Sequence, residues 1–341
     1  MINFSSENFT GVHGKVMSAL VRANSGTVPS YGNDLYTEKA VDILKEYFGK
    51  EIDVFFTFNG TGANNFGLGC VIEKYQSVFC TDIAHLYVNE STAPEAFLGC
   101  RIYPVQSFNG KIDIDELTRS IKRLNSIHHP QAKVISITQP TECGTVYSID
   151  ELLTIKKICL DNKMLFHIDG ARFFNAAAHL NVSLKKISSE IGVDILTLGG
   201  TKNGIMYGEA VIFFNMPDTN SFRYHLKRSM QLASKNRFIA VQFLALFENE
   251  LWKDFAVHTN NLAKTFAAEI SNVPEIRIVY PVESNAVFAE IPGHLLPGLR
   301  EKAGFYSWDE GKNIYRFIFS FDNTLEEIEF FTRQLSMGNE R

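Results

Sequence analysis

Short apolar runs rich in β-branched and aromatic residues recur between residues 54 and 215, and helical patterns separate them. Such runs indicate strands buried on both faces, and their alternation with helices is typical of a mostly parallel sheet covered on both sides. We expect a doubly wound α/β domain. The predicted strands lie near 54–59, 77–82, 100–106, 133–139, 164–169, 194–199 and 209–215, and candidate helices near 62–75, 113–123 and 148–161.

The pattern changes after Asn215, where long helical segments continue to about residue 271. Short β-rich segments follow and predict a small sheet; they lie at 277–280, 285–291 and 314–320. A chain of 341 residues with 45% hydrophobic content is long enough for one large core and a second, smaller domain. We therefore expect an N-terminal arm and large cofactor-binding domain over 1–235, and a small α+β domain over 236–341.

Composition and charge exclude several classes of partner. The formal net charge of −5 argues against a nucleic-acid binder, which would carry a basic surface. No run approaches the roughly 20 apolar residues of a membrane span, and the segment from Met1 has no basic stretch before an apolar core. The five cysteines lack metal-ligand spacing and are interpreted as reduced core thiols. We expect a cytoplasmic protein that binds neither nucleic acid nor membrane.

Two predicted strands end at residues with a distinctive chemistry. The strand 164–169 ends at Asp169, and the strand 194–199 runs through Gly200 and Thr201 into Lys202. Open α/β sheets bind ligands at the carboxyl ends of their strands. Pyridoxal 5'-phosphate needs a lysine to hold its aldehyde as a Schiff base and a carboxylate to keep its pyridine nitrogen protonated. We predict this cofactor, with Lys202 and Asp169 in those roles.

A phosphate site is expected where the strand near 54–59 gives way to a helix. Gly60, Thr61 and Gly62 are small enough for backbone N–H groups to approach an anion, and the helix amino terminus adds a favourable dipole. Lys227 or Arg228 would add positive charge, although a solvated helix face explains both equally well. His167 and Asp169 alternate on one strand, but no cluster supplies further ligands, so no metal is expected.

Four runs in the chain resemble the low-specificity threonine aldolases, within the β-eliminating lyase group of pyridoxal-phosphate enzymes. The similarity covers nearly the whole chain. A further run, 137–147, resembles the branch of that family that includes phenylserine-cleaving aldolases. The four runs are Asn59-Gly-Thr-Gly-Ala-Asn64, Ala84-His85, His167-Ile-Asp-Gly-Ala-Arg172 and Gly199-Gly-Thr-Lys-Asn-Gly204.

The resemblance implies pyridoxal-phosphate fold type I, with a seven-stranded, mostly parallel sheet and a smaller C-terminal domain. It implies cleavage of L-threonine, L-allo-threonine or related β-hydroxy-α-amino acids to glycine and an aldehyde. It assigns His85 to stacking on the cofactor ring and Ser6, Arg172 and Arg316 to the substrate carboxylate, and it places Arg172 among the cofactor-binding residues as well. Arg316 lies inside an apolar strand, where it must either find an anion or extend to water.

The family also implies a homodimer or homotetramer with shared active sites. The loop that holds Tyr31 reaches across a subunit boundary in this family, so Tyr31 is a candidate substrate contact of a neighbouring subunit. A turn tyrosine packed on the surface is an equally good interpretation of the same residue.

One position departs from the family. Many threonine aldolases have a histidine near the substrate hydroxyl, whereas the matching place here is Glu142. A carboxylate can accept the hydroxyl proton if its surroundings tune its pKa towards neutrality. Glu142 is therefore a candidate base, and a water positioned near His85, itself a candidate catalytic residue, is the other. A structural turn whose Glu142 side chain faces solvent is the alternative interpretation.

Two other functions fit the same residues. Another pyridoxal-phosphate enzyme, such as an aminotransferase or a β-eliminating lyase, would share the cofactor residues and differ in its products. A non-catalytic binding protein built on the same fold is the second alternative, because a fold does not fix a function.

Overall fold

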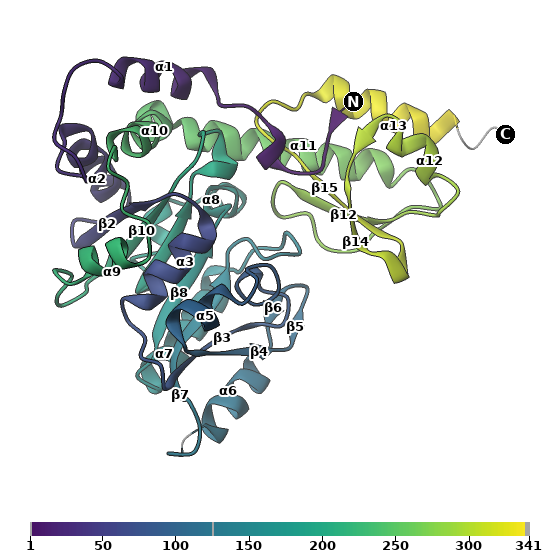
Figure 1. Cartoon of the computed structure of the whole chain (residues 1–341). Helices are drawn as coiled ribbons and strands as arrows, with labels where there is room; N and C mark the ends of the chain where they lie inside the picture. The colour runs from purple at the N-terminus through teal and green to yellow at the C-terminus, as the bar shows by residue number, and fades with distance from the viewer. Residues whose placement is uncertain (1, 125, 338–341) are drawn as a thin grey trace.

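A seven-stranded sheet forms the centre of the large domain in the computed structural model, which describes residues 2–124 and 126–337 (Figure 1). All seven predicted strands are present, with ends within two residues of the expected positions. In sheet order they are β2 (Ile52–Thr57), β10 (Glu209–Phe214), β9 (Ile195–Gly199), β8 (Leu165–Gly170), β7 (Gln131–Thr138), β3 (Gln76–Thr81) and β4 (Arg101–Val105).

One strand of this sheet runs against the others. β10 is antiparallel to both β2 and β9, while the remaining pairs are parallel. The strand β10 therefore begins at the edge of the sheet where its neighbours end, so that Glu209 lies opposite Thr57 of β2 and Gly199 of β9.

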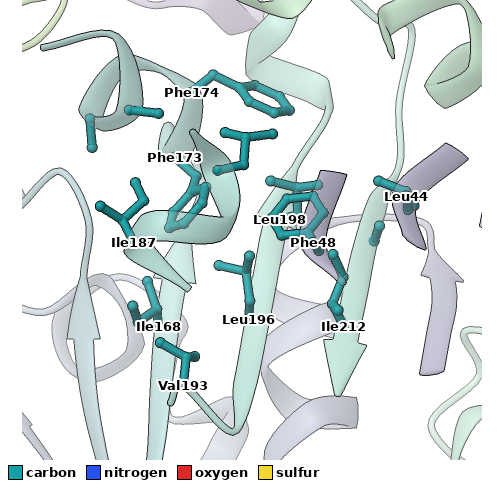
Figure 2. Packing of buried hydrophobic residues seen from close by; sticks show 14 of the residues in the cluster. Leu44, Phe48, Ile168, Phe173, Phe174, Ile187, Val193, Leu196, Leu198 and Ile212 are labelled. Atoms are coloured by element: carbon teal, nitrogen blue, oxygen red, sulfur yellow. The ribbon is translucent and has the colours of Figure 1, made fainter. Parts of the chain in front are cut away.

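Apolar helices cover both faces of the sheet. Leu44 and Phe48 of α2 (Leu35–Phe48) pack in the same core as Leu198 and Ile212 of the sheet (Figure 2). The face with these residues also receives α1 (Gly14–Ala23), α7 (Ile149–Asp161), α8 (Phe173–Leu180) and α10 (Arg237–Phe247). The opposite face packs on α3 (Gly60–Gly69) and α9 (Phe222–Arg228).

The helix predicted over 62–75 is present, but it ends at Gly69, well before the predicted end. The helix α3 begins at Gly60, where the side chain of Asn59 accepts the Gly62 N–H at 2.8 Å, and it ends at Gly69. Glycine is a poor helix former, and Gly67 and Gly69 close the last turn. The predicted helices 113–123 and 148–161 are confirmed as α6 (Ile114–Arg123) and α7, each with a side-chain cap on its first turn.

A second core belongs to the C-terminal sheet. The three predicted strands are confirmed as β11 (Arg277–Ile278), β12 (Ala286–Glu290) and β15 (Ile314–Ile318), and β14 (Tyr306–Asp309) is an additional edge strand. Helices α12 (Leu296–Arg300) and α13 (Leu325–Met337) lie beside this sheet (Figure 1).

The long helix α11 (Leu251–Ile270) joins the two cores. Leu251, Trp252 and Ala256 at its start pack in the first core, whereas Leu262 and Phe266 pack in the second. The predicted boundary at 235–236 lies before α10, and it stays a prediction. Among the described residues, no helix is both long and apolar enough to cross a membrane.

The N-terminal arm crosses between the two domains. Its first strand, β1 (Ile2–Asn3), pairs with β13 (Ala303–Gly304) of the small domain, and Phe4 is fully buried in the second core. The chain then passes through the short helix η1 (Glu7–Phe9) towards α1, which lies against α10 (Figure 1).

Candidate active site

Polar residues gather on one face of the sheet at the edge where the parallel strands end. Alternate residues of a strand point to opposite faces, and Ile168, Leu196 and Ile212 pack in the core that contains α2. Asp169 and Glu209 therefore point to the other face, which packs on α3. The candidate site is built on this face and edge.

Asp169 is the centre of a buried hydrogen-bond chain. Its Oδ1 accepts the backbone N–H of Ala171 at 3.1 Å, and its Oδ2 accepts from Asn64 Nδ2 at 3.0 Å. The same amide of Asn64 donates to Glu90 Oε1 at 2.9 Å, and that oxygen lies 3.0 Å from His85 Nδ1. These contacts fix the Asp169 carboxylate and the His85 ring relative to each other.

His85 and Glu142 meet at the ends of β3 and β7. Glu142 Oε1 accepts the His85 backbone N–H at 2.9 Å and the Thr138 hydroxyl at 2.6 Å, while Oε2 is buried without a partner among the described residues. Burial raises the pKa of Glu142 above its usual value, and these hydrogen bonds oppose that shift. In this geometry Glu142 is enclosed beside His85.

Lys202 lies in the short helix η3 (Thr201–Asn203), directly after β9. Burial is the main cause of its lowered pKa, and the Arg172 cation lowers it further, while the carboxylates of Glu7, Asp169 and Glu209 oppose the shift. A lysine with a lowered pKa is more often uncharged near neutral pH and is therefore a better nucleophile.

The substrate-carboxylate candidate Arg172 already has an anionic partner. Its Nε and one terminal nitrogen donate to the two oxygens of Glu7 at 2.6 and 2.9 Å. Glu7 also accepts from Asn285 Nδ2 of the small domain at 2.8 Å. Burial alone would raise the pKa of Glu7, but the Arg172 guanidinium holds it at about 2. The predicted residue Ser6 is buried beside this pair, and its hydroxyl accepts the Asn8 N–H at 3.1 Å.

Arg316 of the small domain is a cation with no ion pair among the described residues. Its guanidinium lies over the rings of Tyr306 and Trp308, with 5.4 and 5.9 Å to the ring centroids. Its Nε is buried and has no hydrogen-bond partner in the described part of the chain. Burial and the nearby Arg172 cation lower the pKa of Arg316 to about 10. A buried donor without a partner is costly, so this side chain is suited to receive an anion.

The start of α3 leaves backbone donors free. The Gly62 and Ala63 N–H groups bond to Asn59, so the N–H groups of Gly60 and Thr61 remain at the helix amino terminus. A cavity of about 720 Å³ runs along this helix, and Thr61, Gly62 and Arg228 are among its lining residues. Arg228 therefore lines the same cavity as two residues of the predicted phosphate site, whereas the Lys227 Nζ lies over the Tyr31 ring, 5.4 Å from its centroid.

Tyr31 lies on an exposed turn with a left-handed backbone, at a φ of 60°. Its N–H donates to the Ser234 carbonyl at 3.0 Å, and its carbonyl accepts from Arg223 at 3.1 Å. These contacts place Tyr31 beside the segment around α9, and its ring is 41% exposed.

The sequence interpretation missed four polar residues that hold this site together, namely Glu7, Asn64, Glu90 and Glu209. Asn64 is the last residue of the run Asn59–Asn64, which resembles the family, so the sequence did offer a reason to include it. Glu7 and Glu90 lie far from their partners in sequence, and only the folded chain pairs them with Arg172 and Asn64. Among the described residues, no group of three or more potential metal ligands is found.

Comparison with known proteins identifies the family of this chain. A model of the family described as "Beta-eliminating lyase" matches residues 3–292. The low specificity L-threonine aldolase of Pseudomonas aeruginosa is 36% identical over 98% of this chain and 97% of its own length. That of Saccharomyces cerevisiae is 26% identical over 84% of this chain and 73% of its own length.

A solved structure extends the likeness to the fold. The threonine aldolase of Leishmania major superposes with a TM-score of 0.93 at 25% identity, covering 99% of both chains. The expected fold type I is thereby confirmed, with its mostly parallel seven-stranded sheet and smaller C-terminal sheet domain. The family model matches most of the chain, and the Pseudomonas aeruginosa enzyme is 36% identical to it over nearly its full length. The chain therefore belongs to the beta-eliminating lyase family.

Proposed function

We propose that this protein is a pyridoxal-phosphate-dependent aldolase that cleaves L-threonine, L-allo-threonine or a related β-hydroxy-α-amino acid to glycine and an aldehyde. The names of its full-length relatives support this activity. The observation that carries the proposal is the unpaired Nε of Arg316, which lies on the small domain near the Arg172–Glu7 pair. An amino-acid carboxylate is the anion that would satisfy it.

The residues present fit the cofactor. Asp169 is held by two hydrogen-bond donors, so its carboxylate is fixed for a pyridine nitrogen. Lys202 has a lowered pKa and would anchor the group through Nζ. The free N–H groups of Gly60 and Thr61 would hold the phosphate, and the His85 ring would stack on the pyridine. When bound there, pyridoxal phosphate accepts electron density from Cα and so weakens the Cα–Cβ bond.

The remaining residues bind substrate and move its proton. Arg316 holds the substrate carboxylate by a charge-assisted contact. Ser6 and Arg172 complete the carboxylate site, and Arg172 shares its guanidinium with Glu7. Glu142, with its free Oε2 beside His85, accepts the β-hydroxyl proton as the Cα–Cβ bond breaks. A water held near His85 is the alternative acceptor. Asp169 keeps the ring nitrogen protonated throughout.

We also propose that the enzyme acts in the cytoplasm as a homodimer or homotetramer. Tyr31 then contacts the substrate in a neighbouring subunit. The exposed ring of Tyr31 and its stacking with Lys227 support this role. A Tyr31→Phe variant would keep the ring and remove only the hydroxyl.

Product analysis tests the proposed reaction. The cofactor-saturated protein is incubated with L-threonine, L-allo-threonine or phenylserine, without a keto acid. We expect equal amounts of glycine and aldehyde: acetaldehyde from the first two and benzaldehyde from the third. Ammonia and 2-oxobutyrate instead of glycine would identify a β-eliminating lyase, and a single transfer that stops without an acceptor would identify an aminotransferase. No turnover of any of the three would favour a binding protein.

A further inference from the structure

Glu209 is a buried carboxyl group that the proposed reaction does not use. It is the first residue of β10, and because that strand is antiparallel, Glu209 lies at the edge where β9 ends before Lys202. Its side chain is 7% exposed and points to the face of the sheet that packs on α3. A buried acid is expected to have hydrogen-bond or charge partners, because charged groups are seldom buried without them.

The partners of Glu209 are in the turn that carries Lys202. Glu209 Oε2 accepts the backbone N–H of Gly200 at 2.6 Å. The Thr201 hydroxyl closes the same turn from the other side by accepting the Gly208 N–H at 3.1 Å. The two contacts tie residues 200 and 201 to the start of β10. The backbone that presents Lys202 is therefore held by the carboxyl group of an adjacent strand.

We propose that Glu209 is a positioning residue for Lys202, one that clamps the turn beneath the amine and sets the charge of that amine. This inference rests on the proposed role of Lys202. The charged groups around Lys202 are Arg172, which precedes α8, Glu7 of η1, Asp169 of β8 and Glu209 of β10. Of these, Glu209 alone is also hydrogen-bonded to the turn that holds the lysine.

The ionisation of Glu209 gives this role a pH dependence. Burial raises its pKa to about 7, opposed by the hydrogen bonds from Gly200 and Thr201 and by the Lys202 cation, and raised further by Asp169. Above that pH the Glu209 carboxylate favours the ammonium form of Lys202. Below it Glu209 is neutral, and a Glu209→Gln variant has the same charge as the parent protein.

The pKa of the Lys202 amine in the cofactor-free protein tests the proposal. Lysines are labelled by reductive methylation across neutral to strongly alkaline pH, and peptide mass spectrometry gives the reactivity of Lys202 at each pH. In Glu209→Gln we expect the apparent pKa of Lys202 to fall by about 0.5 unit, less than the 1–3 units that a close charge partner can give. The two reactivity curves should meet below pH ~7, where the acid is neutral. A Glu209→Asp variant, which restores the charge, should recover part of the shift.

A matched control is Asp194→Asn. Asp194 lies just before β9, at the opposite end of that strand from Lys202, and its Oδ2 also accepts a backbone N–H, from Phe166 at 2.7 Å. This variant should leave the Lys202 curve unchanged. Identical curves for the parent and Glu209→Gln, or equal shifts in Glu209→Gln and Asp194→Asn, would overturn the proposal. Because the assay contains neither cofactor nor substrate, its failure is separate from a failure of the aldolase assignment.

Discussion

The groups proposed to hold the cofactor and those proposed to meet the substrate differ in how far the protein satisfies them with hydrogen bonds. In the large domain, the Asp169 carboxylate has two donors and the His85 ring has a carboxylate partner. In the small domain, Arg316 rests on aromatic rings, and its Nε lacks a partner among the described residues. A group that is already satisfied keeps its geometry before a ligand arrives, whereas an unsatisfied group gains most when a ligand binds. We infer that Asp169 and His85 are organised for the cofactor, whereas Arg316 Nε and Glu142 Oε2, both without a partner among the described residues, are left for the substrate.

The largest effect is expected at Lys202, among the residues proposed to hold the cofactor. Lys202→Ala should lower turnover by ~10³-fold or more, which corresponds to about 4 kcal/mol of transition-state free energy. Borohydride reduction of the parent protein followed by peptide mapping should find the pyridoxyl group on Lys202. The exposed Lys185 is the control, and its replacement by Ala should change neither result. A label on another lysine would defeat the assignment.

Asp169→Asn comes next. The amide keeps the shape of the carboxylate but does not stabilise a protonated ring nitrogen, so turnover should fall by about 10²–10³-fold, as when a fixed electrostatic group is lost. Absorption of the bound cofactor should show that much of it is retained. Near-normal turnover in a cofactor-loaded variant would exclude this role.

Glu142→Gln tests whether the enclosed carboxylate is a base. General bases typically contribute 10²–10⁴-fold, and we expect a loss of about 10²-fold. Since the raised pKa of Glu142 belongs to a group that acts when ionised, activity should fall as pH decreases through that pKa, above the usual value of 4.5. This acidic limb should be absent from the pH profile of the variant. A profile that keeps it would shift the role to a water near His85.

Arg316→Lys probes the proposed contact with the substrate carboxylate. An ammonium keeps the charge and loses the two-pronged contact, so kcat/KM should fall by about 10–100-fold, mainly through KM, as expected for a charge-assisted hydrogen bond. Arg277→Lys is the matched control, because Arg277 pairs with Glu290 on the exposed edge of the same sheet. If the two variants behave alike, Arg316 is structural.

The smallest effect is expected at His167, two residues before Asp169 on β8, and it is an effect on stability. Its ring is buried between the hydroxyls of Ser136 at 2.8 Å and Thr197 at 3.2 Å, and burial lowers its pKa to about 4. A histidine whose folded pKa is depressed stabilises the fold above its unfolded pKa of about 6.5, and this contribution is lost as pH falls towards 4. His167→Asn should flatten the fall in the free energy of unfolding over that interval. An unchanged slope in denaturant titrations would contradict this account.

Strand ends were the most predictable part of the site. Asp169 and Lys202 follow buried apolar runs, and parallel strands bring their carboxyl ends to one edge, so local pattern and topology were enough to expect both at one site. The small domain was harder. Its edge strand β14 is only Tyr306–Asp309, and a segment this short has no readable alternation.

Partners distant in sequence were not predictable. Glu7 pairs with Arg172 across 165 positions, and no local pattern encodes such a contact. The role of Glu209 was not predictable for the same reason, because an acid at the start of an apolar run is usually a solvated strand end. Only the antiparallel course of β10 brings it next to the turn before Lys202.

The position of helix α11 determines which fragments of the chain can keep a buried core. Because its first turns are buried in one core and its later turns in the other, no cut on either side of this helix leaves both fragments with a closed hydrophobic surface. A fragment ending at residue 235 would also lose the buried side chains of α10 from the large core. The small domain is therefore expected to lose stability when the large one unfolds, and a hinge between them would have to bend a continuous helix of 20 residues.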